Sequence, residues 1–363
     1  LASELAAARV RLFSPAAILS KLERRLDVLT SGPRDAPRRQ RSFPATLEWS
    51  EELLDPSERM LFQRMAVFSG GCTSEAVEAV CNARQDVVGN IEDLLCGLID
   101  KNMVVRANDD ELLRVTQLET MREYAQERLA ASKDSTLARH AHAAYYLILA
   151  EEVYGLRGQE QSHWMRRSDL EYANFRAAFE WLLENQKFEW AVGLTSALMP
   201  FWEARALLAE GLDWTNRLLR LPRPVQQPAW KARALQNNAY LLHLQGDIEP
   251  WMPRFAEMLE AFGQLDDRRS IAQGKISYGV VLAEIGRHDD GREQVEEGLA
   301  LWRELGDKRG EAGALANLAT LAKITGDTIR ARELCRRSRE LFDQVGNKEG
   351  VAWSLNHEAD AAR

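Results

Sequence analysis

The segment that decides the fold spans residues 268–347 and reads RRSIAQGKISYGVVLAEIGRHDDGREQVEEGLALWRELGD followed by KRGEAGALANLATLAKITGDTIRARELCRRSRELFDQVGN. The two halves are each 40 residues long and agree at their aromatic and small positions. Trp302 matches Phe342, and Gly279 matches Ala319. A fixed period of this length is typical of proteins built from stacked supersecondary units.

The period of 40 continues over residues 229–363 and marks five columns of related residues. The columns are Phe262, Trp302 and Phe342; Leu265, Leu305 and Val345; Ala232, Ala272, Ala312 and Ala352; Ala239, Gly279, Ala319 and Ala359; and the turn residues Gly246, Gly286 and Gly326. We therefore predict three helical hairpins, with small residues where helices approach closely. Because one hairpin cannot cover its own apolar face, the hairpins are expected to stack and to leave a curved face open.

These columns resemble the tetratricopeptide repeat, with Asn237 and Asn317 at a position that is often polar in that family. The resemblance implies that the first helices line a concave groove for a protein or small-molecule ligand. The matching positions are Arg233, Gln236, Tyr240, His243, Gln273, Glu284, Thr320 and Lys323. The alternative interpretation is that they are solvated helix residues. The first hairpin departs from the pattern, because Trp251 and Met258 stand where small residues are expected.

The segment 44–132 has the pattern of a winged-helix domain. Helix starts are predicted at Asp55-Pro56 and at Thr73, and a further helix over Asn90–Asp100. Two short β-type runs, 103–106 and 112–118, are joined by polar turn residues and predict one β-hairpin. A closing helix is expected from about Glu119 to Ala131.

The remaining segments are predicted to be helical. Residues 1–43 are interpreted as the helical remnant of an upstream module, and residues 133–228 as a helical connector or the start of the solenoid. The predicted fold class is therefore mainly all-α: a small winged-helix domain with one β-hairpin, followed by a tetratricopeptide-like α-solenoid over 229–363.

Several strings in a fixed order resemble one bacterial family. They are Leu5–Arg9, Ala45–Ser50, Leu53–Pro56, Leu61–Phe62, Ala66–Gly71, Leu118–Ala125, Leu170–Glu171 and Asn174–Ala178. Their order and spacing are similar to those of the large transcriptional regulators of the STAND ATPase class. Such proteins carry an NB-ARC-type nucleotide-binding domain, a helical and winged-helix segment, and a tetratricopeptide tail. The resemblance implies a regulatory and sensor segment that couples a bound ligand or partner to the nucleotide-binding domain.

The phosphate-binding loop of that family, GxxxxGK[ST], does not occur in the 363 residues. The chain starts with Leu1, just inside the position of the family's Gly-Leu-Pro-Leu motif, so we expect the ATPase core to lie upstream. ATP or ADP would then bind in that domain, and this chain is expected to hold no cofactor and to be no enzyme. The upstream domain itself is an expected partner.

Four residues are candidates for contact with the nucleotide-binding domain: Arg38, Arg39, Arg41 and Glu119. The arginines lie in a basic loop, and a solvated loop is the alternative. Glu119 matches the histidine of the Met-His-Asp motif found in relatives outside bacteria. Because a glutamate would repel a phosphate, the alternative is a helix-start residue that favours the helix dipole.

The charge distribution argues against direct DNA contact. The net charge is −8, with +5 in residues 1–44 and −13 in the remainder. The helix that would enter the major groove, Asn90–Lys101, carries three acids and one base, whereas phosphate contacts need the opposite sign. A plain repeat scaffold without a nucleotide link is the second hypothesis, and a DNA-binding winged-helix regulator with a sensor tail is the third.

Metal and catalytic chemistry are not expected from the sequence. His140 and His142 are too close in sequence to share a helix face, and no hydrolase elbow motif is present. The four cysteines are dispersed, which favours a reducing compartment and a cytoplasmic location. No signal peptide and no run of 18 apolar residues occur, so no membrane span is expected.

Overall fold

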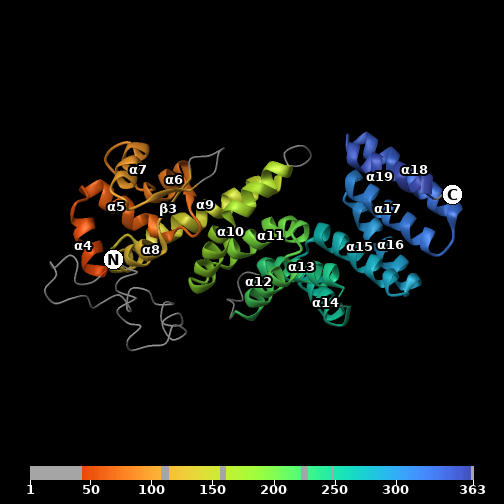
Figure 1. The fold of residues 1–363 in the computed structure, drawn as a ribbon. Helices are drawn as coiled ribbons and strands as arrows, with labels where there is room; N and C mark the ends of the chain where they lie inside the picture. The colour runs from red at the N-terminus through yellow and green to blue at the C-terminus, as the bar shows by residue number, and fades with distance from the viewer. Residues whose placement is uncertain (1–42, 108–113, 156–160, 222–227, 247, 361–363) are drawn as a thin grey trace, which may run out of the picture. The chain divides into compact units, whose positions relative to one another are not determined.

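A computed structural model describes residues 43–360, apart from 108–113, 156–160, 222–227 and 247. The chain forms two compact units, Leu1–Ala197 and Leu198–Arg363. Both consist mainly of helices, and a small sheet accompanies the helices of the first unit (Figure 1). The predicted fold class, a mainly helical chain with helical repeats, is confirmed. The helices predicted over residues 1–43, and with them Arg38, Arg39 and Arg41, lie outside the described residues.

The first unit begins with short helices and ends with long ones. Its elements are α4 (Phe43–Glu52), α5 (Pro56–Arg64), the 3-10 helix η3 (Met65–Val67), β1 (Cys72–Thr73), α6 (Ser74–Cys81), α7 (Ile91–Asp100), β2 (Val105–Ala107), β3 (Arg114–Thr116), α8 (Glu119–Ala131), α9 (Ser135–Gly155), α10 (Gln161–Glu184) and the start of α11 (Phe188–Ala204). The predicted helix starts are present. The Asp55 side chain accepts from the backbone N–H groups of Ser57 and Glu58, and Asn90 caps α7 in the same way.

The sheet has three antiparallel strands in the order β1-β3-β2. The predicted hairpin supplies β2 and β3, with Val105 opposite Thr116. The pairing of β1, with Cys72 opposite Val115, was not predicted. A strand of two residues has no alternation to reveal it. Gly71, at φ +90°, lets the chain pass close to β3, because an added Cβ would lie 3.0 Å from the carbonyl oxygen of Val115.

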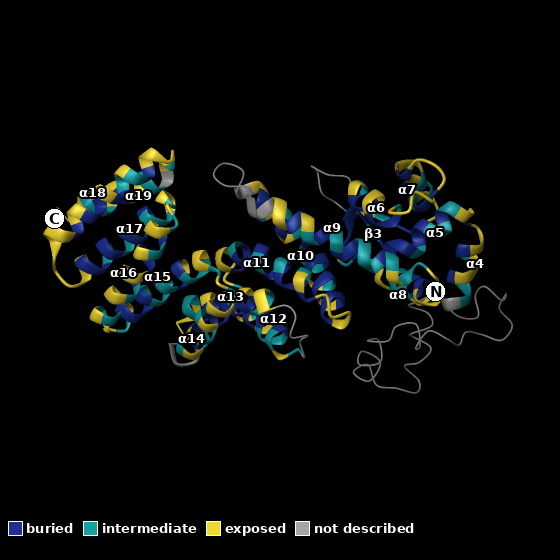
Figure 2. Ribbon diagram, turned by 180° about the vertical axis from the view of Figure 1, so that it is seen from behind, coloured by how far each residue is buried: buried dark blue, intermediate teal, exposed yellow. Residues whose placement is uncertain are grey.

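The core of the first unit lies between its short helices, the sheet and the long helices α9 and α10. Phe62, Val77, Leu98 and Val115 are fully buried there, and α6 and α10 both pack against α9. Figure 2 shows the buried residues along the inner sides of these helices. No helix among the described residues is long and apolar enough to cross a bilayer.

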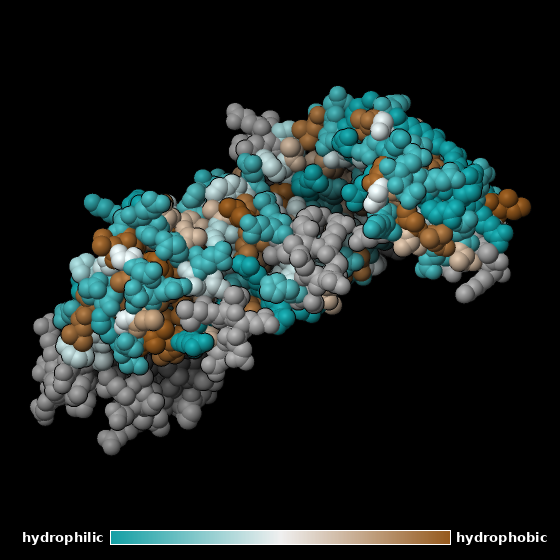
Figure 3. Space-filling view, turned by 90° about the horizontal axis from the view of Figure 1, so that it is seen from above, coloured by the Kyte–Doolittle hydropathy of each residue, from teal (hydrophilic) through white to brown (hydrophobic). Residues whose placement is uncertain are grey.

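The second unit is a row of helical hairpins. After the end of α11 come α12 (Leu208–Arg220), α13 (Pro228–Gln245), α14 (Ile248–Gln264), α15 (Arg268–Glu284), α16 (His288–Glu304), α17 (Lys308–Ile324), α18 (Thr328–Gln344) and α19 (Lys348–Asp360). Consecutive helices pack against each other. On the face displayed in Figure 3, hydrophilic residues predominate and hydrophobic residues form separate small patches. The apolar side chains of the repeats are therefore mostly used between helices.

A left-handed backbone residue follows each helix from α13 to α18, at intervals of 20 residues. The positions with positive φ are Gly246, Asp266, Gly286, Gly306, Gly326 and Gly346, and the series extends back to Ala206 and Gln186. The sequence period of 40 is thus two helix-and-turn units of equal length. The predicted turn glycines have this conformation, but the turns at Gly306 and Gly346 and the series before residue 229 were not predicted.

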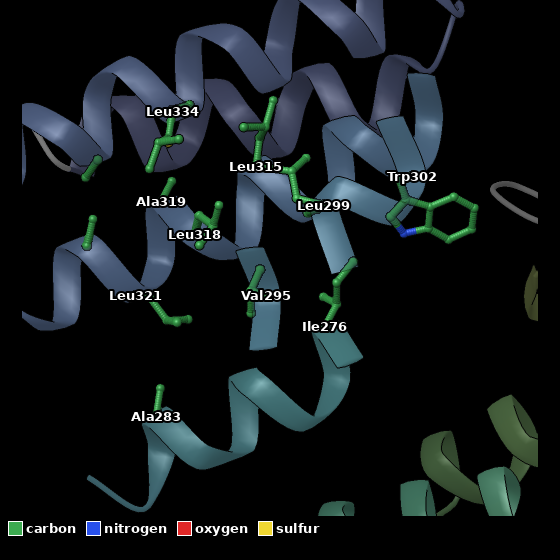
Figure 4. Close-up of a cluster of buried hydrophobic side chains, with 14 of the residues drawn as sticks. Ile276, Ala283, Val295, Leu299, Trp302, Leu315, Leu318, Ala319, Leu321 and Leu334 are labelled. Carbon is green, nitrogen blue, oxygen red and sulfur yellow. The ribbon is translucent and has the colours of Figure 1, made fainter. Parts of the chain in front are cut away.

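The core of the repeats lies between α15, α16, α17 and α18. Ile276, Val295, Leu299, Leu315 and Leu318 form its centre (Figure 4). The column of small residues works as predicted, since a Cβ on Gly279 would lie 2.4 Å from the carbonyl oxygen of Gly291. The backbones of α15 and α16 therefore meet without a side chain between them.

Candidate partner-binding pocket on the helical repeats

A pocket of about 390 Å³ opens on the first helices of the repeats. It is lined by Gln273, Ile276, Trp302, Asp307, Arg309, Gly310, Gly313, Ala314, Asn317, Phe342 and Asn347. These residues come from α15 and α17 and from the ends of α16 and α18. The pocket thus depends on two successive hairpins, and no single repeat could form it.

The aromatic walls of the pocket are the repeating Trp302 and Phe342. Each ring presses on a glycine in the first turn of the next helix: a Cβ on Gly310 would lie 2.3 Å from the Trp302 ring, and one on Gly350 would lie 2.5 Å from the Phe342 ring. The indole stands at the margin of the hydrophobic core (Figure 4). Its N–H is buried and has no hydrogen-bond partner among the described residues. A buried donor of this kind is usually satisfied by water or by a ligand.

The middle of the pocket is open because of Gly313. A Cβ at this position would meet nothing within 4 Å. One turn later on the same helix, the side-chain amide of Asn317 donates to the carbonyl oxygen of Gly313 at 2.9 Å. Ile276 and Ala314 add apolar surface. The pocket therefore combines an apolar interior with amide groups, which is the composition that ligand sites commonly have.

Two charged residues line the mouth of the pocket. Asp307 caps α17 and forms an ion pair with Arg269. The backbone N–H of Gly310, aided by Arg269, lowers the pKa of the Asp307 carboxyl below its ordinary value. The negative charge of Asp307 is therefore balanced by Arg269. The guanidinium of Arg309, in contrast, has no ion pair or hydrogen bond within the described part of the chain. The mouth thus presents one cation that is free to meet a ligand.

Most of the predicted groove residues lie elsewhere on the first helices. Of the eight, Gln273 lines the pocket. Arg233 donates to Gln236 at 2.9 Å, and Tyr240 donates to Glu203 at 3.1 Å. Thr320 donates to the carbonyl oxygen of Ala316, and Lys323 is exposed near the end of α17. Their role in binding stays a prediction.

The structure also brings together two predicted residues from different helices. The Nδ1 atom of His243 lies 3.7 Å from an oxygen of Glu284. The His243 ring also lies near Trp251, whose ring packs at a tilt against Phe255. Trp251 is fully buried, so the first hairpin fills with aromatic rings the space that small residues leave in the later hairpins.

A further repeating column in the sequence marks the position of the pocket. Asp267, Asp307 and Asn347 form a further column at the period of 40, and each caps the helix that follows it. The glycines at 310 and 350 repeat beside them. Together with the aromatic column, they mark where a ring folds over the first turn of the next repeat.

The predicted contact residue Glu119 is already partnered. It lies at the start of α8, is exposed, and forms an ion pair with Arg122 at 2.8 Å. The surface of α7 remains acidic as expected: Glu92 and Asp93 are exposed, and Lys101 pairs with Glu58. The one basic residue at the end of this helix, Lys101, is already paired with an acid, so the helix has no positive charge left for a phosphate group.

His140 and His142 take part in aromatic packing. His140 lies against Trp181 and Trp190, and His142 packs against Phe68 and Tyr146. Among the residues that the structure describes, no group of three or more His, Cys, Asp or Glu could hold a metal ion.

A buried polar network joins the sheet of the first unit to α10. Arg114 of β3 forms an ion pair with Glu171 of α10, and both side chains are almost fully buried. Glu171 also accepts from Tyr146 at 3.0 Å and from Asn174 at 2.8 Å. Burial, with Glu171 nearby, raises the pKa of Tyr146 well above its ordinary value, so it remains a donor.

The same network reaches the glycine turn before β1. Asn174 donates to the carbonyl oxygen of Gly71 at 2.8 Å and accepts from the backbone N–H of Ser69 at 2.7 Å. Two of the strings behind the family resemblance, Ala66–Gly71 and Asn174–Ala178, therefore meet in space. Both strings hold the sheet of the first unit (β1, β3 and β2) against α10. This sheet is called the sheet module below.

No family model matches the chain. It is 38% identical over 245 residues to a protein of Mycobacterium tuberculosis assigned as an HTH-type transcriptional regulator, an alignment that covers 66% of this chain and 28% of that protein. It is 28% identical over 389 residues to the regulatory protein AfsR of Streptomyces griseus, covering 100% of this chain and 38% of AfsR. The chain thus spans roughly a third of the length of these relatives.

Two solved structures are similar in outline. One is a STAND protein with a tetratricopeptide repeat sensor from Pyrococcus horikoshii, at 12% identity and a TM-score of 0.44, covering 99% of this chain and 62% of that one. The other is the apo form of RapI, at 15% identity and a TM-score of 0.47, covering 58% of this chain and 74% of that one.

Proposed function

We propose that the chain is the regulatory and sensor segment of a STAND-type transcriptional regulator. The repeats would bind a partner, and the sheet module would pass the binding event to an NB-ARC-type domain that holds ATP or ADP. Transcriptional regulators among the relatives support the regulatory role. The order of sequence motifs supports the link to a nucleotide-binding domain.

The observation that carries the proposal is the pocket beside Gly313. Its apolar walls fit an apolar side chain, while Gln273 and Asn317 can bond to peptide groups on either side. An extended segment of a protein has both features. A small ligand with an apolar body and a carbonyl group could occupy the pocket through the same contacts.

Coupling would run through the buried network of the first unit. Arg114, Glu171 and Asn174 hold the sheet on α10 by hydrogen bonds that are nearly closed to water. Packed elements with satisfied polar contacts move as one body. A ligand-dependent shift of α10 would therefore carry the sheet module with it and change its fit to the nucleotide-binding domain.

The proposed role is one of binding in the cytoplasm, without catalysis in this chain. A plain scaffold would share the pocket but would have no effect on nucleotide turnover. A DNA-binding regulator would need a cationic surface, and the exposed acids of α7 argue against it.

Gly313→Leu tests the proposal, because leucine would fill the pocket without a clash at its Cβ. The matched control is Gly263→Leu on α14, where an added Cβ also meets open space. Tagged complete gene products carrying each change would be used to capture partners, and transcripts would be compared between the two strains. We expect Gly313→Leu alone to lose a partner and to alter transcription.

Three results would count against the proposal. Identical partners and transcripts for the two variants would remove the pocket from the mechanism. Partner loss with unchanged nucleotide hydrolysis by the complete product would favour the plain scaffold. Salt-dependent DNA binding by the 363-residue chain would favour the DNA-binding regulator.

A further inference from the structure

A smaller pocket, of about 90 Å³, lies in the first unit where its short helices meet the long ones. Its walls come from η3 and the turn after it, and from α8, α9 and α10; η3, α8 and α10 all pack against α9 (Figure 1). A cavity of this size has room for about three waters at roughly 30 Å³ each, so it fits only a small ligand. The lining residues are Ala66, Val67, Ser69, Gln126, Arg139, His142, Ala177 and Trp181.

The pocket is lined by a cation, and none of its lining residues is acidic. Arg139 of α9 is half-buried and has no ion pair or hydrogen bond within the described part of the chain. One turn later, burial lowers the pKa of His142 to about 4, so its imidazole is neutral at pH 7. A guanidinium that is partly withdrawn from water is stabilised by an anion that accepts its hydrogen bonds. The charge of the pocket therefore suits an anionic ligand.

The other lining residues divide into hydrogen-bonding groups and apolar surface. The side-chain amide of Gln126 donates to the carbonyl oxygen of Ala66 at 3.2 Å, and its nitrogen carries a second hydrogen. Ser69 adds a hydroxyl group. The apolar surface comes from η3 and from one face of α10, where Ala177 and Trp181 are four residues apart. A ligand with one charged end and an apolar remainder fits this division.

Two of the lining residues are bonded to the network that holds the sheet module on α10. The Oδ1 atom of Asn174 accepts from the backbone N–H of Ser69 at 2.7 Å and lies 3.4 Å from Nε2 of His142. Because this oxygen can only accept, Nε2 carries the proton of the neutral imidazole. A ligand in the pocket would therefore touch the residues that surround Asn174.

We propose that this pocket binds a short-chain carboxylate, whose charged group pairs with Arg139 and whose apolar stem lies against Ala177 and Trp181. A planar guanidinium matches a carboxylate through two parallel hydrogen bonds. Phosphate or sulfate would need hydrogen-bond donors on all sides, and half of the lining residues are apolar. The same group is present in a free acid such as propionate and in a glutamate side chain of a bound protein. The small volume favours the free acid.

The test is saturation-transfer NMR of propionate with the 363-residue chain, a method that suits the weak binding of a ligand with few atoms. We expect saturable binding. Arg139→Gln should weaken it by about tenfold or more, because a hydrogen bond to a charged group is lost. Arg139→Lys keeps the charge without the planar fork and should retain part of the binding. Arg106→Gln removes an exposed charge from the same unit, and as the control it should leave binding unchanged.

A filled pocket and a second ligand complete the test. Ala177→Leu fills the pocket without a change of charge and should also abolish binding. The N-acetyl amide of glutamate carries the same carboxylate on a peptide backbone. Its exclusion would support the free acid, whereas tighter binding than that of propionate would overturn the free acid in favour of a protein side chain.

Three further results would overturn the inference. They are the absence of saturable propionate binding, equal binding by Arg139→Gln and Arg106→Gln, and full binding by Ala177→Leu. Circular dichroism confirms that each variant is folded. This site lies in the first unit and the pocket beside Gly313 lies in the second. Gly313→Leu should leave propionate binding unchanged, so failure of either proposal would not affect the other.

Discussion

At the scale of single residues, the ion pair between Arg114 and Glu171 is the most constrained contact of the first unit. Each side chain is 3% exposed, so neither charge can be solvated by water. Burial of two charges costs free energy that their attraction and hydrogen bonds must offset. Tyr146 and Asn174 provide those additional bonds to Glu171. The pair therefore fixes geometry more than it adds stability.

Arg114→Met should lower the free energy of unfolding by about 3–5 kcal/mol, because it leaves the Glu171 carboxylate buried without its cation. Adding Glu171→Gln should recover part of this loss, since the amide is neutral and its oxygen can still accept from Tyr146 and Asn174. Urea denaturation of the single and double variants measures both effects. Further destabilisation by the second change would show that Glu171 does not depend on Arg114.

His142 should make the first unit sensitive to acid. Burial lowers the pKa of this histidine from 6.5 to about 4 in the folded protein. Between these values the unfolded chain binds more protons, so the free energy of unfolding falls as the pH drops through this range. The loss between pH 7 and pH 5 should be about 2 kcal/mol.

The measurement compares urea denaturation at pH 7 and pH 5 for the natural chain and for His142→Gln. The glutamine does not titrate, so its pH difference should be smaller by the amount that His142 contributes. Equal pH differences in the two proteins would mean that folding does not lower the pKa of His142.

Individual residues were predicted from the sequence when they act locally. Asp55 was recognised as a helix cap because a cap bonds to a backbone only two or three residues away. The ion pair of Arg114 with Glu171 was not, because these residues are 57 apart in sequence and meet only after α9 and α10 have packed. The strings that contain Gly71 and Asn174 were identified, but as markers of a family and not as contacts.

At the scale of elements, α17 carries two glycines with opposite roles. Gly310 accommodates the Trp302 ring, where an added Cβ would lie 2.3 Å from the indole. Gly313, one turn later, faces open space. Gly310→Ala should therefore destabilise the repeats by about 1–3 kcal/mol through overpacking. Gly313→Ala should be neutral or should stabilise them by up to about 1 kcal/mol through helix propensity.

Thermal or urea unfolding of the two variants checks this difference. Because both changes are glycine to alanine on one helix, their effects on the unfolded chain are equal. Equal stability of Gly310→Ala and Gly313→Ala would contradict the close packing of the Trp302 ring on Gly310.

Elements with strong helical periodicity and clear caps were predicted well. The exceptions have physical reasons. The strand β1 has two residues and no pattern. The regular turns at Ala206 and Asp266 were not predicted, because these residues adopt positive φ without being glycine. Packing of the neighbouring helices holds them there.

At the scale of the whole molecule, the period of 40 predicted the stack, because every repeat repeats its packing contacts. It did not predict the pocket. The pocket depends on rings from α16 and α18 that fold over the first turns of α17 and α19, and on the absence of a side chain at Gly313. Such features depend on residues between Gln273 and Asn347 that meet only in the folded stack, and on the absence of a side chain from the surface. The sequence therefore indicated the face but only one lining residue, Gln273.

We propose that the repeats bind a partner protein through the pocket beside Gly313. The most direct test is the dissociation constant of the captured partner, measured by isothermal titration against the natural chain, Gly313→Leu and Gly263→Leu. We expect at least a tenfold weaker complex for Gly313→Leu and an unchanged one for Gly263→Leu. Equal dissociation constants for all three proteins would contradict it.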